Sequence, residues 1–353
     1  MPLPPRRVFV FCMAGMRSSE QESRWHLPRR TFGKQRRYLR LPPFCPSRRS
    51  RPEVSGLVRL VECVPNFSEG RRREVIDAIA DEIRRTPGAR LLDVQADESH
   101  NRCVLSFVGE PEAVRAAALA AARRAVELID MNAHRGEHPR LGAVDVIPVV
   151  PIAGVTMEEC VAVAHTLGRE IWGNLGVPVF FYAEAATRPE RRRLPDIRKG
   201  EYEGLTEKLA DPAWLPDVGE PRPHPTAGAT VVGARRPLIA YNINLATNDV
   251  EIARTVARAV RESGGGLVNV QAMGVMSESG RAQVSMNLLD YTNTPVYRAY
   301  ELVRLEAARY GVEVTESEIV GLIPLDAVAD VARFYLRLRG FDRDQVLEAK
   351  LME

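Results

Sequence analysis

Two parts of this sequence repeat the same order of hydrophobic patterns, and that order limits the possible folds more than any other feature. Period-2 patterns predict strands, and period-3.6 patterns predict helices. The first part gives the order strand, helix, strand, strand, helix, strand, over residues 60–64, 71–86, 90–94, 103–108, 112–129 and 144–148. This is the ferredoxin-like order, in which two helices cover one face of an antiparallel sheet. A helix over 156–175 and a strand over 178–182 extend this part.

The second part follows a loop-rich section over 184–228. Its predicted elements are a strand, a helix, two strands, a helix, a strand and a last helix, over residues 237–245, 250–262, 267–273, 282–289, 295–310, 312–315 and 325–337. The two parts share element order rather than residue identity. We therefore predict an α+β fold of two ferredoxin-like (βαββαβ) subdomains packed across a cleft, over residues 58–237 and 238–353.

Residues 1–57 differ from the rest in charge and proline content. They contain 13 of the 49 Lys and Arg residues, 3 of the 46 Asp and Glu residues, and 8 of the 25 prolines. Because helical and strand periodicity are lacking, we predict a disordered basic leader outside the packed core. Three explanations remain open: an organellar transit peptide, a nucleic-acid arm, or sequence translated from a misplaced start codon. We favour the third, with Val58 as a candidate alternative initiation codon.

Composition excludes several classes of function for the remaining chain. It carries 36 basic against 43 acidic residues, whereas a nucleic-acid-binding domain needs a basic face. No apolar run approaches the roughly 20 residues that span a bilayer. The five cysteines lack metal-ligand spacing and argue for a reducing cytoplasm without disulfides or zinc. Phosphate-loop and dinucleotide fingerprints are also absent from the sequence. The charge balance therefore favours a small-molecule protein.

The run Gly136-Glu137-His138-Pro139-Arg140 holds a histidine between two residues that restrict or bend the backbone. Pro139 favours extended geometry at His138, and Gly136 permits a tight turn. A histidine titrates near neutrality, so it can accept and donate a proton within one turnover. We predict that His138 is a catalytic acid/base. The alternative is a surface histidine in an ordinary turn.

Four further residues near strand ends are candidates for substrate binding. Arg102 and Arg140 could each clamp a carboxylate with parallel hydrogen bonds, although either one alone could be a solvated surface arginine. Asp145 could orient His138 or bind a cationic group, or could be an exposed strand residue. Asn66 closes the first strand within a dense set of turn formers. A purely local capping role explains it as well as a substrate contact does.

The loop Gly219-Glu220-Pro221-Arg222-Pro223-His224-Pro225-Thr226-Ala227-Gly228 has three prolines between two glycines. It is too stiff for a flexible tether and too irregular for a helix or strand. A rigid loop beside a cleft can hold a flat ring at a low entropy cost. The alternative is a connector between subdomains.

Several motifs in the same order resemble those of the formiminotransferase domain family. They are the runs over residues 60–70 (LVECVPNFSEG), 136–140 (GEHPR), 154–157 (GVTM), 199–203 (KGEYE) and 242–245 (NINL). The resemblance extends from about Val58 to about Tyr335 without a large gap. In that family the histidine of the Gly-Glu-His-Pro-Arg motif is the catalytic acid/base, which implies this role for His138. The family's folate-binding stretch corresponds by position to 219–228.

The resemblance implies transfer of a formimidoyl group from N-formimino-L-glutamate to N5 of tetrahydrofolate, a step of histidine breakdown. Tetrahydrofolate would be a co-substrate, and no metal would be needed. Bifunctional members continue into a cyclodeaminase domain, and since the sequence ends at Glu353 we expect only the transferase activity. We further expect a cytoplasmic homodimer that binds neither nucleic acid nor membranes. Two rival classes are a non-catalytic folate-binding protein and a one-carbon transferase with a formyl donor.

Overall fold

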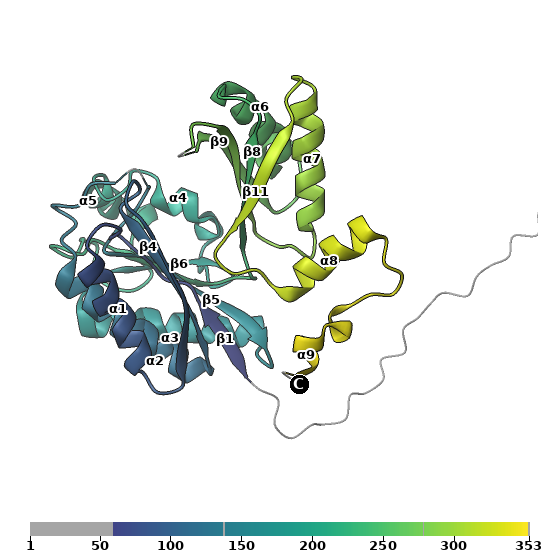
Figure 1. The fold of residues 1–353 in the computed structure, drawn as a ribbon. Coiled ribbons are helices and arrows are strands. Elements are labelled where there is room, and N and C mark those ends of the chain that lie inside the picture. The colour runs from purple at the N-terminus through teal and green to yellow at the C-terminus, as the bar shows by residue number, and fades with distance from the viewer. Residues whose placement is uncertain (1–58, 137, 278, 352–353) are drawn as a thin grey trace, which may run out of the picture. The chain divides into compact units, whose positions relative to one another are not determined.

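The computed structural model describes residues 59–136, 138–277 and 279–351, so the predicted leader over 1–57 lies outside them. Within these residues the strands form one seven-stranded and one four-stranded sheet (Figure 1). Each sheet belongs to one half of the chain. This arrangement confirms the predicted α+β fold with two sheet-containing subdomains.

The first sheet contains a ferredoxin-like core. Its elements are β1 (Leu60–Cys63), β2 (Asn66–Phe67), α1 (Arg73–Arg85), β3 (Ala89–Asp97), β4 (Arg102–Gly109), α2 (Pro111–Leu128) and β5 (Val144–Ala153). The order β5-β1-β4-β3 is antiparallel throughout. The short strand β2 pairs with both β4 and β5. This is the ferredoxin-like order, with the fourth strand beside the first.

A crossover unit extends this sheet beyond β5. It consists of α3 (Met157–Leu175), β6 (Val179–Ala183) and β7 (Thr230–Ala234), and β7 pairs in parallel with both β5 and β6. α3 connects β5 to β6, the two strands that flank β7, and parallel strands need a crossover connection of this length. A capping box between Thr156 and Glu159 starts α3, and Gly176 ends it in the left-handed conformation.

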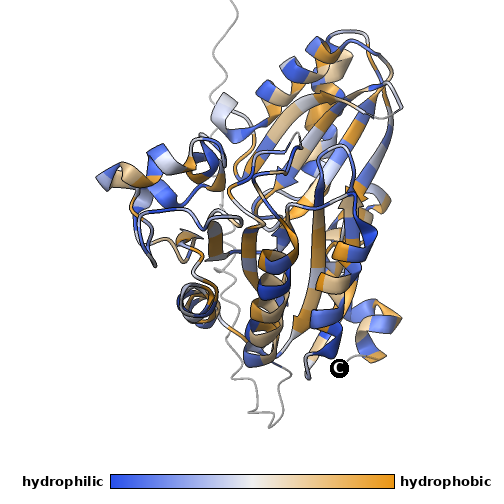
Figure 2. Ribbon diagram, turned by 90° about the vertical axis from the view of Figure 1, so that its left-hand side faces the viewer, coloured by the Kyte–Doolittle hydropathy of each residue, from blue (hydrophilic) through white to orange (hydrophobic). Residues whose placement is uncertain are grey.

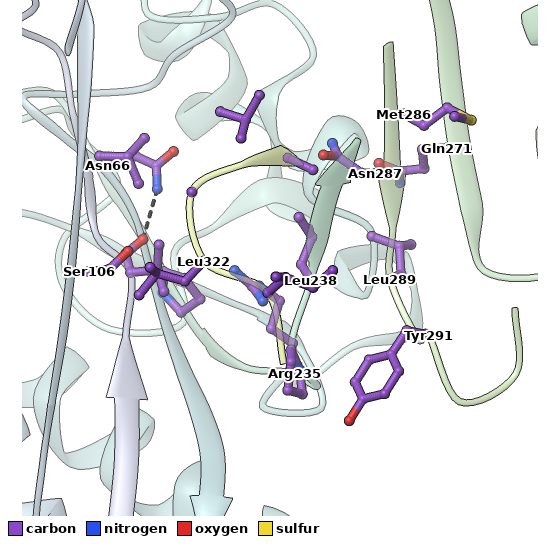
Figure 3. Close-up of a pocket in the computed structure, with 18 of the residues that line it drawn as sticks. Asn66, Ser106, Arg235, Leu238, Gln271, Met286, Asn287, Leu289, Tyr291 and Leu322 are labelled. Carbon is purple, nitrogen blue, oxygen red and sulfur yellow. Dashed lines mark hydrogen bonds between the residues drawn. The ribbon is translucent and has the colours of Figure 1, made fainter. Parts of the chain in front are cut away.

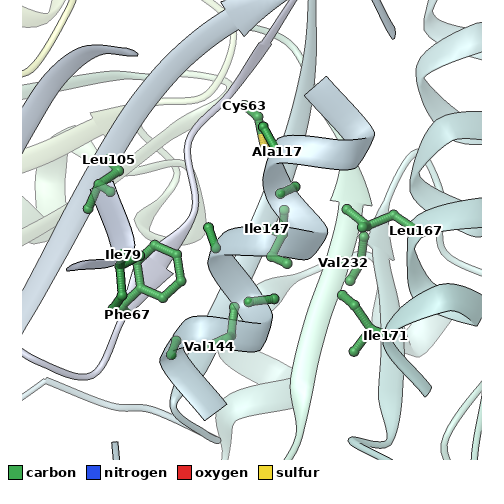
Figure 4. Packing of buried hydrophobic residues seen from close by; sticks show 14 of the residues in the cluster. Cys63, Phe67, Ile79, Leu105, Ala117, Val144, Ile147, Leu167, Ile171 and Val232 are labelled. Carbon is green, nitrogen blue, oxygen red and sulfur yellow. The ribbon is translucent and has the colours of Figure 1, made fainter. Parts of the chain in front are cut away.

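Helices α1, α2 and α3 cover one face of the first sheet (Figure 1). Apolar residues recur on one side of α1, and alanines do so on α2, so each helix can lie close to the strands. The buried side chains of strands and helices interdigitate, as Phe67, Ile79, Leu105, Ile147 and Leu167 do in Figure 4. The opposite face of the sheet is therefore left for other contacts.

The second sheet repeats the ferredoxin-like order. Its elements are β8 (Ile239–Leu245), α6 (Val250–Val260), β9 (Val270–Met276), β10 (Ala282–Leu288), α7 (Val296–Ala308), β11 (Val314–Val320) and α8 (Leu325–Leu336). The strand order is β11-β8-β10-β9, again antiparallel. Helices α6 and α7 pack on one face. The predicted strand over 312–315 was too short, since β11 extends to Val320. Most side chains of β11 are exposed, so the sequence shows no apolar alternation that would mark the strand.

The section over 184–228 contains short helices rather than loop alone. They are α4 (Leu194–Arg198), α5 (Leu205–Ala210) and 3-10 turns over Pro189–Arg191 and Pro212–Trp214. The Lys208 ammonium donates to the Lys199 carbonyl at 2.9 Å and also contacts the Ile197 carbonyl. Lysine near a helix C-terminus satisfies its free carbonyls, so Lys208 fixes the end of α4.

The remaining turns and helices are short. Two 3-10 turns span Glu262–Gly264 and Arg343–Gln345, and α9 spans Leu347–Leu351. The ribbon alternates between hydrophilic and hydrophobic residues along its elements (Figure 2). Among the described residues no helix is both long and apolar enough to cross a membrane.

We expect alanine substitutions at two glycines to change stability with opposite signs. A Cβ on Gly70 would lie 2.1 Å from the Asp97 carbonyl oxygen and 2.5 Å from the Arg102 nitrogen. Since backbone atoms cannot move aside cheaply, Gly70→Ala should lower the free energy of unfolding by about 2 kcal/mol. Gly173 lies inside α3 with no atom within 4 Å of such a Cβ. Gly173→Ala should raise stability by about 0.5 kcal/mol.

Urea denaturation of both variants tests this pair of expectations. Equal stabilities for Gly70→Ala and the parent chain would show that the contact with the Arg102 backbone is not tight.

Candidate active site

A cavity of about 2850 Å³ is lined by both sheets, on the faces that carry no helices. Both sheets belong to the same compact unit of the chain. In β4, the lining residues Arg102, Val104 and Ser106 alternate with core residues, as expected for a strand with two different faces. Side chains from the two halves, such as Asn66 and Asn287, enter the same pocket (Figure 3). The predicted cleft is therefore present.

Hydrogen bonds tie the loop that carries His138 to the segment after β1. The Ser68 hydroxyl donates to the Gly142 carbonyl at 2.8 Å. The Asn101 side chain accepts from the Gly70 nitrogen at 3.0 Å and donates to the Arg135 carbonyl at 2.9 Å. These long-range bonds fix the loop on both sides of His138.

His138 lines the cavity, and its Nε2 contacts Nη1 of Arg102. Because a guanidinium only donates hydrogen bonds, Nε2 must be the acceptor, which places the proton of the neutral ring on Nδ1. Nδ1 is buried. The imidazole is thus held in one tautomer, facing the crevice rather than open solvent.

Burial, together with the charges of Arg102 and Arg198, lowers the pKa of His138 to about 3. Each of these effects disfavours the charged imidazolium. At neutral pH the ring is therefore uncharged and can accept a proton. Negative charge brought close to Arg102 or Arg198 would raise this pKa.

Arg102, Arg198 and Asp145 form a charged cluster beside His138. Asp145 is 2% exposed, and its carboxylate accepts from the Leu141 nitrogen at 3.0 Å. Arg198 makes an ion pair with Asp145 that includes an Nε to Oδ1 distance of 3.4 Å. Burial and the charge of Arg198 lower the pKa of Arg102 to about 10. Among these three groups, one positive charge has no partner.

Arg140 lies elsewhere. It is 5% exposed and donates to the carboxylates of Glu201 at 2.9 Å and Glu203 at 2.7 Å. Its Nε donates to Nδ1 of His134 at 3.2 Å, and Nε2 of His134 then donates to the Asn101 carbonyl. Arg140 is not among the residues that line the cavity. The structure therefore brings Arg102 but not Arg140 to His138.

Asn66 and Asp145 differ in their access to the cavity. Asn66 lines it, and its side-chain amide donates to the Val64 carbonyl at 2.8 Å. Asp145 does not line the cavity. It forms an ion pair with Arg198, which does line the cavity. Asn66 is thus placed for direct contact, and Asp145 for holding another residue.

The loop over 219–228 is not part of the cavity lining. Gly228 forms a bridge with Gly142, and the Met131 nitrogen donates to the Thr226 carbonyl at 2.7 Å. The His224 Nδ1 accepts from the Ala227 nitrogen at 3.0 Å. The loop packs as a hydrogen-bonded turn against the start of β5, and the structure does not bring it together with His138.

Comparisons with known proteins agree with this geometry. The family model described as the formiminotransferase domain, N-terminal subdomain, matches residues 60–235, and the model of the formiminotransferase domain matches residues 240–349. The chain belongs to the formiminotransferase domain family. This confirms the resemblance that the motifs indicated.

Curated relatives of the formiminotransferase family cover most of the chain. A glutamate formimidoyltransferase of Streptococcus pyogenes serotype M1 is 46% identical over 298 residues, or 84% of this chain and 100% of that protein. One of Thermoplasma acidophilum is 50% identical and covers 83% of this chain and 97% of its own length. The formimidoyltransferase-cyclodeaminase of Gallus gallus is 51% identical, over 80% of this chain and 53% of that protein.

The cavity contains an arginine that the sequence motifs did not single out, Arg198, and a second histidine, His100, from the polar turn before Arg102. Arg198 ends a five-residue helix in a section that looked loop-rich, although the Lys199-Gly200-Glu201 motif follows it directly. His100 lines the cavity with its ring centroid 6.2 Å from that of His138. Its Nδ1 lies 2.6 Å from the Asp97 carboxylate.

The cysteines of the formiminotransferase fold are packed rather than reactive. Cys63, Cys103 and Cys160 are buried, and burial raises the pKa of each thiol. A raised pKa disfavours the thiolate that would act as nucleophile or metal ligand. No group of three or more His, Cys, Asp or Glu side chains placed to hold a metal occurs in the described part of the chain.

We expect His138 to make stability depend on pH. Its pKa of about 3 in the folded chain lies below the ordinary value of 6.5, so the unfolded chain binds an extra proton between these values. As pH falls from 7 to 5, this group should lower the free energy of unfolding by about 2 kcal/mol. His138→Gln should remove that part of the decrease. Urea denaturation at both pH values measures it, and identical decreases in parent and variant would contradict the assignment.

Proposed function

We propose that the chain transfers the formimidoyl group from N-formimino-L-glutamate to N5 of tetrahydrofolate, in histidine degradation, with His138 as acid/base. The observation that carries the proposal is the neutral His138 ring in contact with Arg102, inside a cavity lined by both subdomains. Membership of the formiminotransferase family supports the reaction class. The two full-length relatives named glutamate formimidoyltransferase support the donor.

The reaction needs one proton acceptor that later becomes a donor. N5 of tetrahydrofolate attacks the amidine carbon, and the new N5–C bond forms as N5 loses its proton. The bond from that carbon to the glutamate nitrogen then breaks, and the nitrogen gains a proton. A single imidazole can perform both transfers. Holding two substrates together in one cavity contributes through proximity.

Arg102 links substrate binding to the state of His138. In the structure its guanidinium donates to Nε2 of His138. A carboxylate of the donor would compete for the same guanidinium, since charge-assisted bonds to carboxylates are stronger than bonds to a neutral ring. Nε2 would then be free to accept the proton of N5. The negative charge would also favour the imidazolium that forms.

The second sheet offers a polar wall in which side-chain amides lie beside the carboxylates of Glu316 and Glu318. Its lining residues include Asn242, Asn244, Gln271, Gln283 and Asn287. A pterin ring carries both donors and acceptors on its edge, and side-chain amides present both kinds of group. Because the loop over 219–228 lies outside the lining, we place the pterin in the cavity rather than on that loop.

The other predicted residues take different parts in this proposal. Asn66 is placed to contact a substrate, and Asp145 holds Arg198 at the cavity. Arg140 stabilises the loop that carries His138 through its bonds to Glu201 and Glu203. The cytoplasmic location and the homodimer stay predictions, and light scattering of the purified protein measures the latter.

The test is an assay with both substrates. Purified protein is incubated with N-formimino-L-glutamate and tetrahydrofolate, and the mixture is then acidified. We expect the absorbance of methenyl-tetrahydrofolate, which forms when the formimidoyl adduct cyclises in acid. No signal, with a working transferase alongside, would favour a non-catalytic folate-binding protein. A faster reaction with a formyl donor would favour the other rival class.

A further inference from the structure

Arg198 combines a buried anchor with access to the cavity. Its side chain is 13% exposed and lines the cavity from the end of α4. Nε and Nη2 contact the two oxygens of Asp145, which leaves Nη1 outside this ion pair. Lys208 fixes the end of the same helix through backbone carbonyls. The guanidinium is therefore held in a fixed position by groups that do not themselves line the cavity.

The charges around Arg198 and Arg102 favour the binding of an anion. Asp145 offsets the charge of only one guanidinium, and Arg102 is the second. Asp97, the next carboxylate along the cavity wall, is engaged by Ser99 and His100. Nε of Arg102 is buried and has no hydrogen-bond partner among the residues that the structure describes. Two desolvated cations beside one carboxylate are unfavourable until an anion joins them.

We propose that Arg198 binds the side-chain carboxylate of the donor while Arg102 binds its α-carboxylate. This inference rests on the proposed function, because N-formimino-L-glutamate carries two carboxylates. The reacting nitrogen is attached to the α-carbon, so the α-carboxylate lies nearest to the reacting atoms. Arg102 touches His138 and takes that carboxylate. Arg198 takes the carboxylate at the far end of the side chain and so selects glutamate over shorter or uncharged amino acids.

The test pairs a variant with an altered donor. N-formimino-L-glutamine replaces the side-chain carboxylate by an uncharged amide. With the parent chain we expect kcat/KM for this analogue to be at least tenfold below that for the natural donor. Arg198→Met should raise KM for the natural donor at least tenfold, leave KM for tetrahydrofolate within about twofold, and abolish the preference between the two donors.

Two further variants make the result specific. Arg198→Lys keeps the charge and should retain part of the preference. Arg192 also lines the cavity but is exposed and paired with Glu184, so Arg192→Met should change neither KM. Circular dichroism of each variant checks folding, and the comparison of donors on the parent chain needs no variant.

The outcomes separate the two proposals. No product from the parent chain with the natural donor would overturn the proposed function. An active parent chain that uses both donors equally, or a folded Arg198→Met that still prefers the natural donor, would overturn the role of Arg198 alone.

Discussion

Replacement of His138 by alanine is expected to lower turnover at least ~100-fold, the usual contribution of a positioned acid/base group. The variant should bind tetrahydrofolate nearly as well as the parent chain, because the side-chain amides that we propose for the pterin lie on the other sheet. Stopped-time assays give turnover, and fluorescence titration gives the dissociation constant of tetrahydrofolate. Loss of binding and turnover together would indicate a collapsed site instead.

His100 offers a matched control for this substitution. It lines the same cavity, but its ring is exposed and is held by Asp97 rather than by Arg102. We expect His100→Gln to retain turnover within about threefold of the parent, since it lies outside the proposed proton path. A loss as large as that of His138→Ala would move the acid/base role to the other histidine.

The fold was predictable because its signal is local and repeated. Apolar residues recur along α1, and β8 alternates buried and half-buried positions, so each pattern indicates its element without tertiary information. Prediction was weakest where side chains face solvent. β11 is mostly exposed, and α4 is five residues long, so neither offers enough periodicity to mark its bounds.

The candidate site was predictable only where residues that restrict the backbone flank a functional side chain. His138 lies between a glycine and a proline, which the sequence displays directly. Ion pairs cannot be predicted from the sequence in this way, because the partners are far apart along the chain. The partners of Arg140 lie 61 and 63 residues after it, and Asp145 lies 53 residues before Arg198. An arginine that looked free is thus engaged, and one that looked unremarkable lines the cavity. Likewise, the stiffness of 219–228 does not tell whether the loop lines the cavity.

We expect Arg102→Met to have the second largest effect, with a kcat/KM for the donor about 100-fold below that of the parent. Breaking a buried charge pair with substrate costs about 3 kcal/mol, which corresponds to this factor. Methionine keeps much of the length and apolar volume of the arginine stem, so the packing around this first residue of β4 should survive. KM for tetrahydrofolate should change little. Initial rates over a matrix of both substrates separate the two effects.

The same substitution should also change the titration of His138. Arg102 is the nearest cation that lowers the pKa of this ring, so its removal should move that pKa upward, toward the ordinary range of histidine. NMR of the histidine ring carbons follows the titration directly. Arg102→Lys serves as the control, because it keeps the charge but loses the planar pair of N–H donors that binds a carboxylate bidentately. It should leave the pKa low while still weakening the donor. A ring that titrates alike in the parent and Arg102→Met would mean that burial and Arg198 keep His138 neutral without Arg102, which would then act on the donor without changing the pKa of the base.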